Sequence, residues 1–407
     1  MQFTDLLVVC AVAFAAPLLA RAGRRLRVPS PVLEIAAGVV LGPSVLGWVR
    51  VTPPVEVLAL IGLAFLLFLA GLEIDVHRLG GPSLRLALAG FAASLALALA
   101  LGTGLALAAL GLTRAPLLVA VTLCATSLGL VVPVLKDAGE IDGSTGTLVV
   151  VASSVADFGA VLLLSLFFSE AATGLGTKLV LLSGLAVVAV LVVLALARIA
   201  MRAERVFAGL AGTTAHIRIR FAVLLLVVFV ALAQGLGFEA ILGAFLAGAV
   251  LRLVDTDAAT VHPQTGLQLD AIGYGFVVPV FFVTSGIRFD AGALATSGAA
   301  QAQVPLFVVA LLLVRGLPAL LYRPRLGTRR AVAAGLLQAT TLPFVVAAVE
   351  IGLRLRVLSP TTGAALVAAG MVSVLVFPAV ASGLLRAAPP PAAPRAAGRA
   401  RDADGAV

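Results

Sequence analysis

Charged residues are scarce in this chain of 407 residues. Only 12% of the residues are Asp, Glu, Lys or Arg, whereas 61% are hydrophobic. A soluble globular protein carries about 25% charged residues. Charge depletion along the whole chain excludes an ordinary soluble domain and indicates an integral membrane protein. The formal net charge of +9 does not indicate nucleic-acid binding, because the arginines lie between apolar runs and not on one face.

Cysteine and histidine are almost absent as well. The two cysteines, Cys10 and Cys124, lie inside apolar runs and imply no disulfide framework. The three histidines, His77, His216 and His262, are scattered and have no nucleophile or metal-ligand spacing around them. No glycine-rich nucleotide fingerprint follows a predicted strand. These observations argue against an enzyme, and we expect no cofactor.

Long apolar runs dominate the sequence. Runs of about 18 residues or more predict membrane-spanning helices. The eighth and ninth runs, divided near Gln234–Gly237, can also be read as one long helix. Thirteen runs are present, at residues 4–20, 31–49, 56–73, 83–111, 116–135, 145–168, 177–200, 218–236, 237–253, 269–287, 303–322, 330–350 and 361–385. The sequence therefore predicts an all-α polytopic membrane protein.

Lysine and arginine are distributed unevenly between alternate loops. With the N-terminus outside, 21 of the 28 basic residues lie in inside loops or the tail, and six lie in outside loops. Such an excess marks the cytoplasmic side, so we expect a cell-membrane protein with its N-terminus outside and its C-terminus in the cytoplasm. The first basic cluster follows the first apolar run, which argues against a cleaved signal peptide. We expect a transmembrane domain over residues 1–386 and a disordered cytoplasmic tail over 387–407.

Two ionisable residues lie near the middle of predicted spans. Asp157 lies in the run 145–168, and Arg315 lies in the run 303–322. Each would cost about 2.5–3.5 kcal/mol at a helix centre, so such residues normally face a bundle interior or water and mark an ion or proton path. The alternative is a structural ion pair that only holds helices together. We expect Asp157 to bind the transported ion and Arg315 to compensate charge.

Other acidic residues lie near the ends of spans. A carboxylate at a helix end is usually hydrated or caps the helix. We therefore assign no transport role to these residues. They are Glu34, Glu73, Asp75, Glu239 and Glu350.

A short stretch recurs more than two hundred residues along the chain. "ATSLGLVV" (125–132), with Thr126 and Ser127, returns as "ATTLPFVV" (339–346), with Thr340, Thr341 and Pro343. The helix breakers are Gly129 and Pro133 beside the first copy and Pro343 in the second. Helix breakers beside hydroxyls at matching positions are the best sequence indication of a transporter's site, because freed carbonyls and hydroxyls can bind ions. Seven spans separate the copies, so they would cross the membrane in opposite directions, as in an inverted repeat. Chance similarity in so apolar a chain is the alternative.

Four longer segments are distinctive. They are "VPSPVLEIAAGVVLGPSVLGWV" (28–49), "LALIGLAFLLFLAGLEID" (58–75), "GFEAILGAFLAGAVL" (237–251) and "VVPVFFVTSGIRFD" (277–290). They resemble bacterial cation/proton antiporters of the monovalent cation:proton antiporter-2 class. The resemblance implies thirteen helices, with a six-helix core around residues 83–168 and 303–385 that contains two crossed broken helices. It also implies that the remainder is a scaffold joining a homodimer, and that access alternates by an elevator-like motion.

The resemblance also implies roles for single residues. The family's ion-binding aspartate corresponds to Asp157, and Ala156 stands where the family has an acidic residue or Asn. The family's basic residue corresponds to Arg315, and the Thr-Ser pair of its first broken helix corresponds to Thr126 and Ser127. We expect Asp157 and Thr126 to hold the cation transiently. The family's Gly-Glu-Phe motif is replaced by "QATTLPF", which lacks a carboxylate, and we expect no nucleotide-binding domain in this chain.

Taken together, these features predict exchange of a monovalent cation for protons by competition at Asp157, with sodium favoured over potassium. Because Ala156 replaces a second carboxylate, we expect one-for-one, electroneutral exchange. A tight pair between Asp157 and Arg315 would oppose cation binding. We therefore expect that pair to form in the empty or transition state and to separate when a cation binds. Three alternatives stay open: potassium/proton exchange, a sodium-coupled organic-solute symporter of the same fold, and a non-transporting membrane sensor.

Overall fold

The protein is described here by a computed structural model that covers residues 4–22, 29–74, 80–105, 115–168, 174–211, 216–257 and 263–387. Within these ranges the chain is helical and contains no strand, so the predicted all-α class is confirmed. Parts of the predictions lie outside the described residues. They are Asp75, His77, His262, residues 106–111 of the fourth predicted span and residues 388–407 of the predicted tail.

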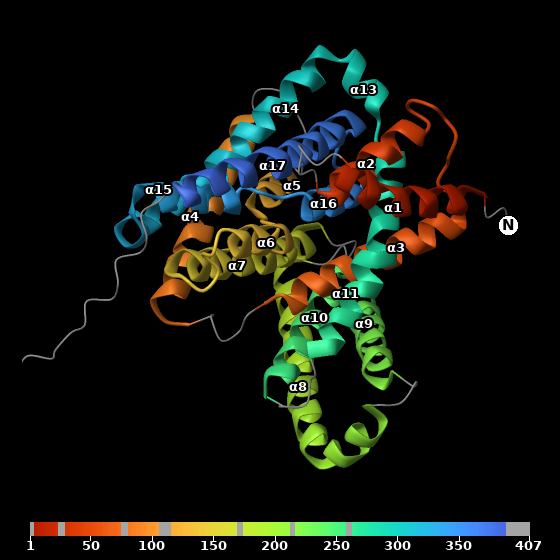
Figure 1. The fold of residues 1–407 in the computed structure, drawn as a ribbon, viewed down its shortest axis with the longest axis vertical. Coiled ribbons are helices and arrows are strands. Elements are labelled where there is room, and N and C mark those ends of the chain that lie inside the picture. Colours follow the sequence, from red (N-terminus) through yellow and green to blue (C-terminus); the bar gives the residue numbers. More distant parts are fainter. Residues whose placement is uncertain are drawn as a thin grey trace, which may run out of the picture.

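Helices follow one another with short connections (Figure 1). Two π-helical turns, η2 (Gly273–Val277) and η3 (Leu312–Gly316), and one 3-10 turn, η4 (Pro318–Tyr322), join α-helices. The α-helices are α1 (Thr4–Ala22), α2 (Ser30–Leu41), α3 (Pro53–Leu72), α4 (Gly81–Leu105), α5 (Ala115–Cys124), α6 (Leu128–Asp137), α7 (Ser144–Phe168), α8 (Leu175–Ala211), α9 (Ile217–Gly235), α10 (Ala240–Asp257), α11 (Pro263–Ile272), α12 (Val278–Ile287), α13 (Ala291–Thr296), α14 (Gly298–Leu311), α15 (Arg323–Gln338), α16 (Pro343–Arg354) and α17 (Pro360–Arg386).

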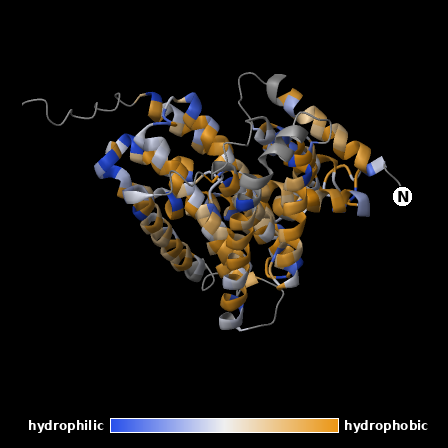
Figure 2. Cartoon of the chain, turned by 90° about the horizontal axis from the view of Figure 1, so that it is seen from below, coloured by the Kyte–Doolittle hydropathy of each residue, from blue (hydrophilic) through white to orange (hydrophobic). Residues whose placement is uncertain are grey.

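Among the described residues, nine helical segments are long and apolar enough to cross a membrane. One of them, Gly298–Arg354, contains two of the predicted spans, and three shorter apolar helices match the first, second and ninth runs. All thirteen predicted runs therefore correspond to apolar helices. The division near Gln234–Gly237 is confirmed, because α9 ends at Gly235 and α10 begins at Ala240. Hydrophobic residues cover the lengths of the helices, and hydrophilic residues gather mainly at their ends (Figure 2).

The second predicted span is wrong in its second half. α2 ends at Leu41, and the backbone N–H groups of Trp48 and Val49 both return to the carbonyl of Leu41. The physical reason is local, since Pro43 cannot donate a helical hydrogen bond and favours a turn. The apolar residues after it fold back as a loop at the end of α2.

The helices pack in two groups. The α3 group contains α1–α3 and α8–α12, and the α7 group contains α4–α7 and α14–α17 together with η3 and η4. Extensive helix contacts lie within the groups, whereas contacts across them run mainly from α7 to α10 and α8. α8 extends beyond the other helices at the bottom of Figure 1.

Two broken helices lie in the α7 group. The first is α5 and α6, separated by Ala125–Ser127, and the second is α15 and α16, separated by Ala339–Leu342. Each follows an apolar helix (α4 or α14) and precedes a long one (α7 or α17), which is the order of the predicted inverted repeat. The predicted breaks are confirmed, although Gly129 and Pro133 lie inside α6 and not in the break.

Helices α3 and α10 pack backbone against backbone. A Cβ at Gly248 would lie 2.0 Å from the carbonyl oxygen of Phe68, and a Cβ at Gly71 would lie 2.2 Å from the carbonyl oxygen of Phe245. Lipid removes the hydrophobic drive between helices, so such close approach by small residues supplies much of the packing energy. This contact holds the α3 group together.

We predict that Gly248→Leu lowers the thermal unfolding temperature of the protein in detergent. Overpacking a close contact costs about 1–3 kcal/mol, and here the new side chain meets backbone that cannot turn away. Gly184→Leu on α8 is the matched control, because a Cβ there meets nothing within 4 Å. Equal unfolding temperatures for the two variants would contradict the packing described.

Candidate functional site

The two helix breaks lie against each other. The N–H of Ser127 donates to the carbonyl of Thr340 at 2.9 Å, and the hydroxyl of Thr126 donates to the carbonyl of Gln338 at 2.7 Å. Broken backbone at membrane depth is tolerated only where protein or water satisfies the freed groups. The first break therefore supplies partners for the second, which fixes where the two broken helices cross.

Asp157 accepts hydrogen bonds from the first break. It projects from the middle of α7, and the N–H of Thr126 donates to its Oδ1 at 3.1 Å. The backbone of Leu128 also lies within interaction range of this carboxylate. Leu128 is the first residue of α6, so the carboxylate lies at a helix N-terminus, where the helix dipole favours negative charge.

Arg315 lies on the other side of Thr126. Its side chain is 1% exposed, and its Nε and Nη2 donate to Thr126 Oγ1 at 3.1 and 2.8 Å, while its Nη1 donates to Ser94 Oγ at 3.2 Å. The expected direct pair with Asp157 is not formed in this structure. Both residues belong to the described chain, and their charged atoms are not within ion-pair distance. Thr126 separates them, with its hydroxyl toward Arg315 and its N–H toward Asp157.

The hydroxyl of Thr126 is fully occupied. It donates one hydrogen bond and accepts two, which is the capacity of a hydroxyl group. In this structure the Thr126 hydroxyl therefore contacts Arg315, where we expected it to contact a cation. The neighbouring Ser127 instead lines a cavity beside Asp157.

This cavity, the aspartate cavity, has a volume of about 90 Å³ and lies between the two helix groups. A volume of this size holds about three water molecules. The polar residues in its wall are Asp157, Thr126, Ser127, Glu73 and Tyr274. The remaining wall is apolar and consists of Pro31, Leu66, Leu67, Ala70, Leu128, Gly129, Leu130, Val161, Phe245, Phe282, Pro343 and Phe344. A few oxygen atoms thus converge in an otherwise apolar pocket.

Glu73 is a second carboxylate of the aspartate cavity, although its position at a span end suggested no such role. It directly follows α3, and the hydroxyl of Tyr274 donates to its Oε1 at 3.5 Å. A Cβ at position 129 would lie 2.9 Å from the same Oε1, so the absence of a side chain at Gly129 leaves room for the carboxylate of Glu73 beside α6. This contact joins three distant segments, and no local pattern in the sequence indicates it.

Two serines one turn before Asp157 were also missed. The hydroxyl oxygens of Ser153 and Ser154 are buried and have no hydrogen-bond partner within the described chain. They precede Asp157 by four and three residues, which places all three on neighbouring faces of α7. A buried hydroxyl without a protein partner usually has a water or an ion. The spacing Ser-Ser-x-x-Asp was readable from the sequence and could have drawn attention to them.

Thr340 and Thr341 support the second break and do not line the aspartate cavity. The N–H of Thr341 donates to Ser373 Oγ at 3.2 Å, and Ser373 Oγ donates back to the carbonyl of Thr341 at 3.0 Å. The hydroxyl of Thr340 donates to the carbonyl of Leu336. Pro343, the third predicted residue of this break, is the first residue of α16 and does line the cavity.

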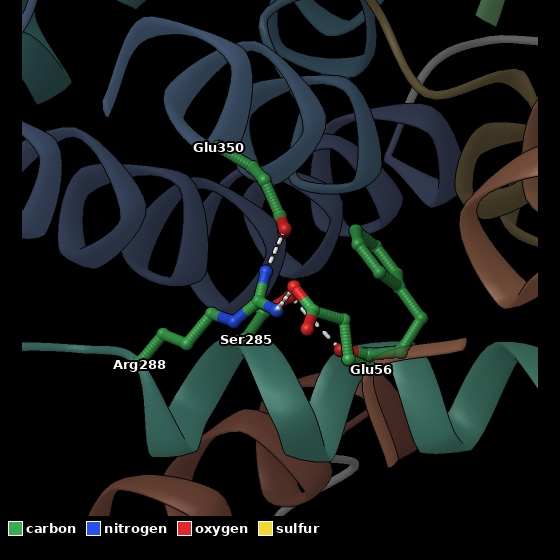
Figure 3. A network of polar contacts seen from close by, with 5 residues as sticks. Glu56, Ser285, Arg288 and Glu350 are labelled. Atoms are coloured by element: carbon green, nitrogen blue, oxygen red, sulfur yellow. Dashed lines mark hydrogen bonds and ion pairs between the residues drawn. The ribbon is translucent and has the colours of Figure 1, made fainter. Parts of the chain in front are cut away.

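A second cavity, of about 320 Å³, lies at the opposite ends of α3, α12 and α16. Ion pairs surround it and join α16 to the α3 group. Arg288, after α12, contacts both Glu350 of α16 and Glu56 at the start of α3, the latter at 3.2 Å (Figure 3). Arg354, at the end of α16, donates to Glu239 before α10 at 2.5 Å. Glu239 and Glu350 thus link the two groups.

Comparisons with known proteins give consistent results. The model of the family described as "Sodium/hydrogen exchanger, transmembrane" matches residues 10–387. YjbQ of Bacillus subtilis, which bears the provisional name of a Na⁺/H⁺ antiporter, is 31% identical over 387 residues, or 92% of this chain. The chain spans 62% of the length of YjbQ. A Na⁺/H⁺ antiporter of Enterococcus hirae is 28% identical over 300 residues, which cover 71% of this chain and 74% of that protein.

A solved structure is also similar. The sodium proton antiporter MjNhaP1 from Methanocaldococcus jannaschii superposes with a TM-score of 0.65 over 94% of this chain and 98% of its own. The two sequences are 17% identical, so the likeness shows a shared fold.

We predict that Thr126→Val destabilises the protein strongly. The change keeps the shape of the side chain but leaves two N–H groups of Arg315 and the carbonyl of Gln338 without their partner, and each buried unsatisfied group costs about 1–3 kcal/mol. Thr122→Val is the control, because that buried hydroxyl only donates to the carbonyl of Leu118 one turn earlier. Thermal unfolding in detergent measures both, and a loss no larger for Thr126→Val than for Thr122→Val would refute the bridging role.

Proposed function

The chain belongs to the sodium/hydrogen exchanger family, and on that premise we propose that it exchanges a monovalent cation for protons across a membrane. Sodium is the proposed cation, and potassium is the alternative. The aspartate cavity is the observation that supports this proposal most strongly. It presents a carboxylate that the first broken helix holds at the boundary between two groups of helices.

Competition at one site explains how exchange works. The carboxylate of Asp157 takes either a proton or a cation, so loading one expels the other. A hard cation is bound by carboxylate, hydroxyl and carbonyl oxygens near a broken helix. We propose that Asp157 and Ser127 bind the cation, with Glu73 facing it across the cavity. Thr126, whose hydroxyl is occupied, orients Asp157 through its backbone N–H.

We propose that the exchange is electroneutral. One proton leaves Asp157 for each monovalent cation that binds, and no net charge then crosses the membrane. Ala156 adds no second carboxylate on α7. Glu73 accepts a hydrogen bond from Tyr274 and lies beside Gly129 of α6, and in this proposal its protonation does not change during the cycle.

The two cavities support alternating access. α3, α12 and α16 each contribute one end to the aspartate cavity and the other end to the second cavity, so the cavities face opposite sides of the membrane. The barrier between them is short along the scaffold helices. It runs from Phe282 to Ser285 on α12, or about 4.5 Å, and from Leu60 to Leu66 on α3, or about 9 Å. A slide of the α7 group by one to two helical turns relative to α3 and α12 would move Asp157 past this barrier.

The uneven distribution of arginine supports the same orientation for the chain as before, with the N-terminus outside and the C-terminus in the cytoplasm. We propose that the aspartate cavity opens to the cytoplasm and the second cavity to the outside. In this view the α7 group, around residues 83–168 and 303–385, is the moving core of the transmembrane domain 1–386. The α3 group is the scaffold, and on the family resemblance it joins two copies as a homodimer.

The ion pairs around the second cavity favour the state in which the aspartate cavity opens to the cytoplasm. Arg288 links Glu350 of the core to Glu56 of the scaffold, and Arg354 links the core to Glu239. The side chains of Arg288, Glu56 and Glu350 are 31%, 54% and 21% exposed. Exposed pairs contribute about 0.2–1 kcal/mol each, which shifts an equilibrium between two states without preventing the change.

Cavity size disfavours the organic-solute symporter. Pockets for small organic ligands have volumes of about 300–1,000 Å³. The aspartate cavity, at about 90 Å³, is far smaller and fits an ion with a few waters. Ion exchange therefore explains the site better than solute transport.

We predict that protein in liposomes with an imposed proton gradient moves protons when sodium is added. Asp157→Asn should abolish this flux, because an amide can neither lose a proton nor balance a cation. Asp137→Asn, at the exposed end of α6, is the control and should transport normally. Flux that survives in Asp157→Asn would move the site elsewhere, and no flux with sodium, potassium or lithium in folded wild type would favour a sensor. Initial rates that change with membrane potential would contradict electroneutral exchange.

We also predict that Arg288→Ala exposes the second cavity. In a background with Cys10→Ser and Cys124→Ala, a cysteine at the cavity wall (Ser285→Cys) should react faster with a membrane-impermeant maleimide when Arg288→Ala is added. The loss of both ion pairs of Arg288 destabilises the conformation in which the second cavity is closed by about 0.4–2 kcal/mol. Arg50→Ala, an exposed arginine predicted on the same side, is the control. Unchanged labelling would contradict the bias assigned to these pairs.

A further inference from the structure

The guanidinium of Arg315 is buried and has only neutral partners. All its hydrogen bonds go to hydroxyls, those of Thr126 and Ser94. A buried charge normally attracts an opposite charge at contact distance. Asp157 is separated from it only by Thr126, yet the two charges do not meet among the described contacts. Another contact must therefore keep the guanidinium of Arg315 away from the carboxylate of Asp157.

We propose that Ser94 is a positioning residue that keeps Arg315 from closing on Asp157 and thereby sets the affinity of Asp157 for the transported cation. The inference rests on the proposed exchange at Asp157. It extends that proposal by giving a role in cation affinity to a residue on α4, outside the broken helices and the aspartate cavity.

The guanidinium is held at two edges. Nε and Nη2 point to Thr126, and Nη1 points to Ser94. Because the group is planar and rigid, contacts at two edges fix its plane, whereas one contact leaves it free to swing. Without the Ser94 hydroxyl, Nη1 has no partner, and the carboxylate of Asp157 is the strongest acceptor nearby. A guanidinium bound to that carboxylate would occupy the oxygens that a cation needs.

Helix α4 packs against the segment that carries Arg315. Ser94 and Gly90 lie one turn apart on the same face of α4. Ser94 contacts Arg315, and a Cβ at Gly90 would lie 3.1 Å from the hydroxyl of Tyr322. Arg315 belongs to the π-helical turn η3 and Tyr322 ends η4, so α4 contacts both ends of this irregular segment. π-helical turns often occur at functional sites, where the extra residue redirects a side chain.

The first test is transport by Ser94→Ala in liposomes. We expect the KM for sodium to rise about tenfold while the maximal rate stays within about twofold, because a competing Arg315–Asp157 pair weakens cation binding and is displaced at high sodium. Ser94→Thr keeps the hydroxyl and should restore the KM. Ser382→Ala is the control, since that part-buried hydroxyl only donates to the carbonyl of Pro378 on its own helix. A lower unfolding temperature with an unchanged KM would show a merely structural serine and overturn the proposal.

The second test needs neither cation nor transport. Asp157→Asn is introduced into wild type and into Ser94→Ala, and thermal unfolding is measured without added sodium. We expect the substitution to lower the unfolding temperature more in the Ser94→Ala background, where it removes a newly formed ion pair. Equal shifts in the two backgrounds would refute the positioning role. If Ser94→Ala fails to fold, Ser94→Cys replaces it, because a thiol has a similar size and accepts hydrogen bonds weakly.

The two tests separate this inference from the function on which it rests. Wild type that moves no protons with any cation would refute the proposed exchange. The unfolding cycle would still decide whether Ser94 keeps Arg315 from Asp157.

Discussion

Backbone groups freed inside a membrane must find partners within the protein, because lipid offers none. That constraint governs the centre of this molecule. The N–H of Ser127 bonds to the carbonyl of Thr340, the N–H of Thr126 bonds to Asp157, and the N–H of Thr341 bonds to Ser373. Each break is therefore completed by another element of the α7 group, and the broken helices are stable only in this crossed arrangement.

The same arrangement prepares an ion site. Satisfying the first break places the carboxylate of Asp157 at the N-terminus of α6 and saturates the hydroxyl of Thr126. It leaves Ser127 at the cavity wall beside Asp157. Arg315 supplies positive charge close to Asp157 without binding it. The same hydrogen bonds thus satisfy the backbone groups of the first break and position Asp157 to bind a cation.

Much of this architecture was predictable from the sequence. Apolar runs located all thirteen spans, the repeated stretch located both breaks, and the mid-span position of Asp157 and Arg315 brought both to the broken helices. These features are local, or repeat at a recognisable period. The misread half of the second span is also a local matter, where the turn at Pro43 outweighed the apolar composition around it.

Contacts between distant segments could not be predicted in this way. Glu73 lies at the aspartate cavity, where the missing side chain of Gly129 leaves room for its carboxylate, and that glycine had been read as a helix breaker. The bond from Arg315 to Ser94 joins residues more than two hundred positions apart. The hydroxyl of Thr126 points to Arg315 and not into the cavity, because a buried guanidinium without hydrogen-bond acceptors costs more free energy than a cavity wall with one hydroxyl fewer. Such preferences depend on what surrounds a residue in three dimensions.

The most direct measurement of the central claim, competition between a proton and a cation at Asp157, is calorimetric titration of the purified protein with sodium in two buffers of different ionisation enthalpy. The difference between the heats gives the number of protons released for each cation bound. The account predicts release of about one proton per sodium ion at a pH at which Asp157 is protonated in the sodium-free protein, and no release in Asp157→Asn. Sodium binding without proton release, or release that persists in Asp157→Asn, would contradict it.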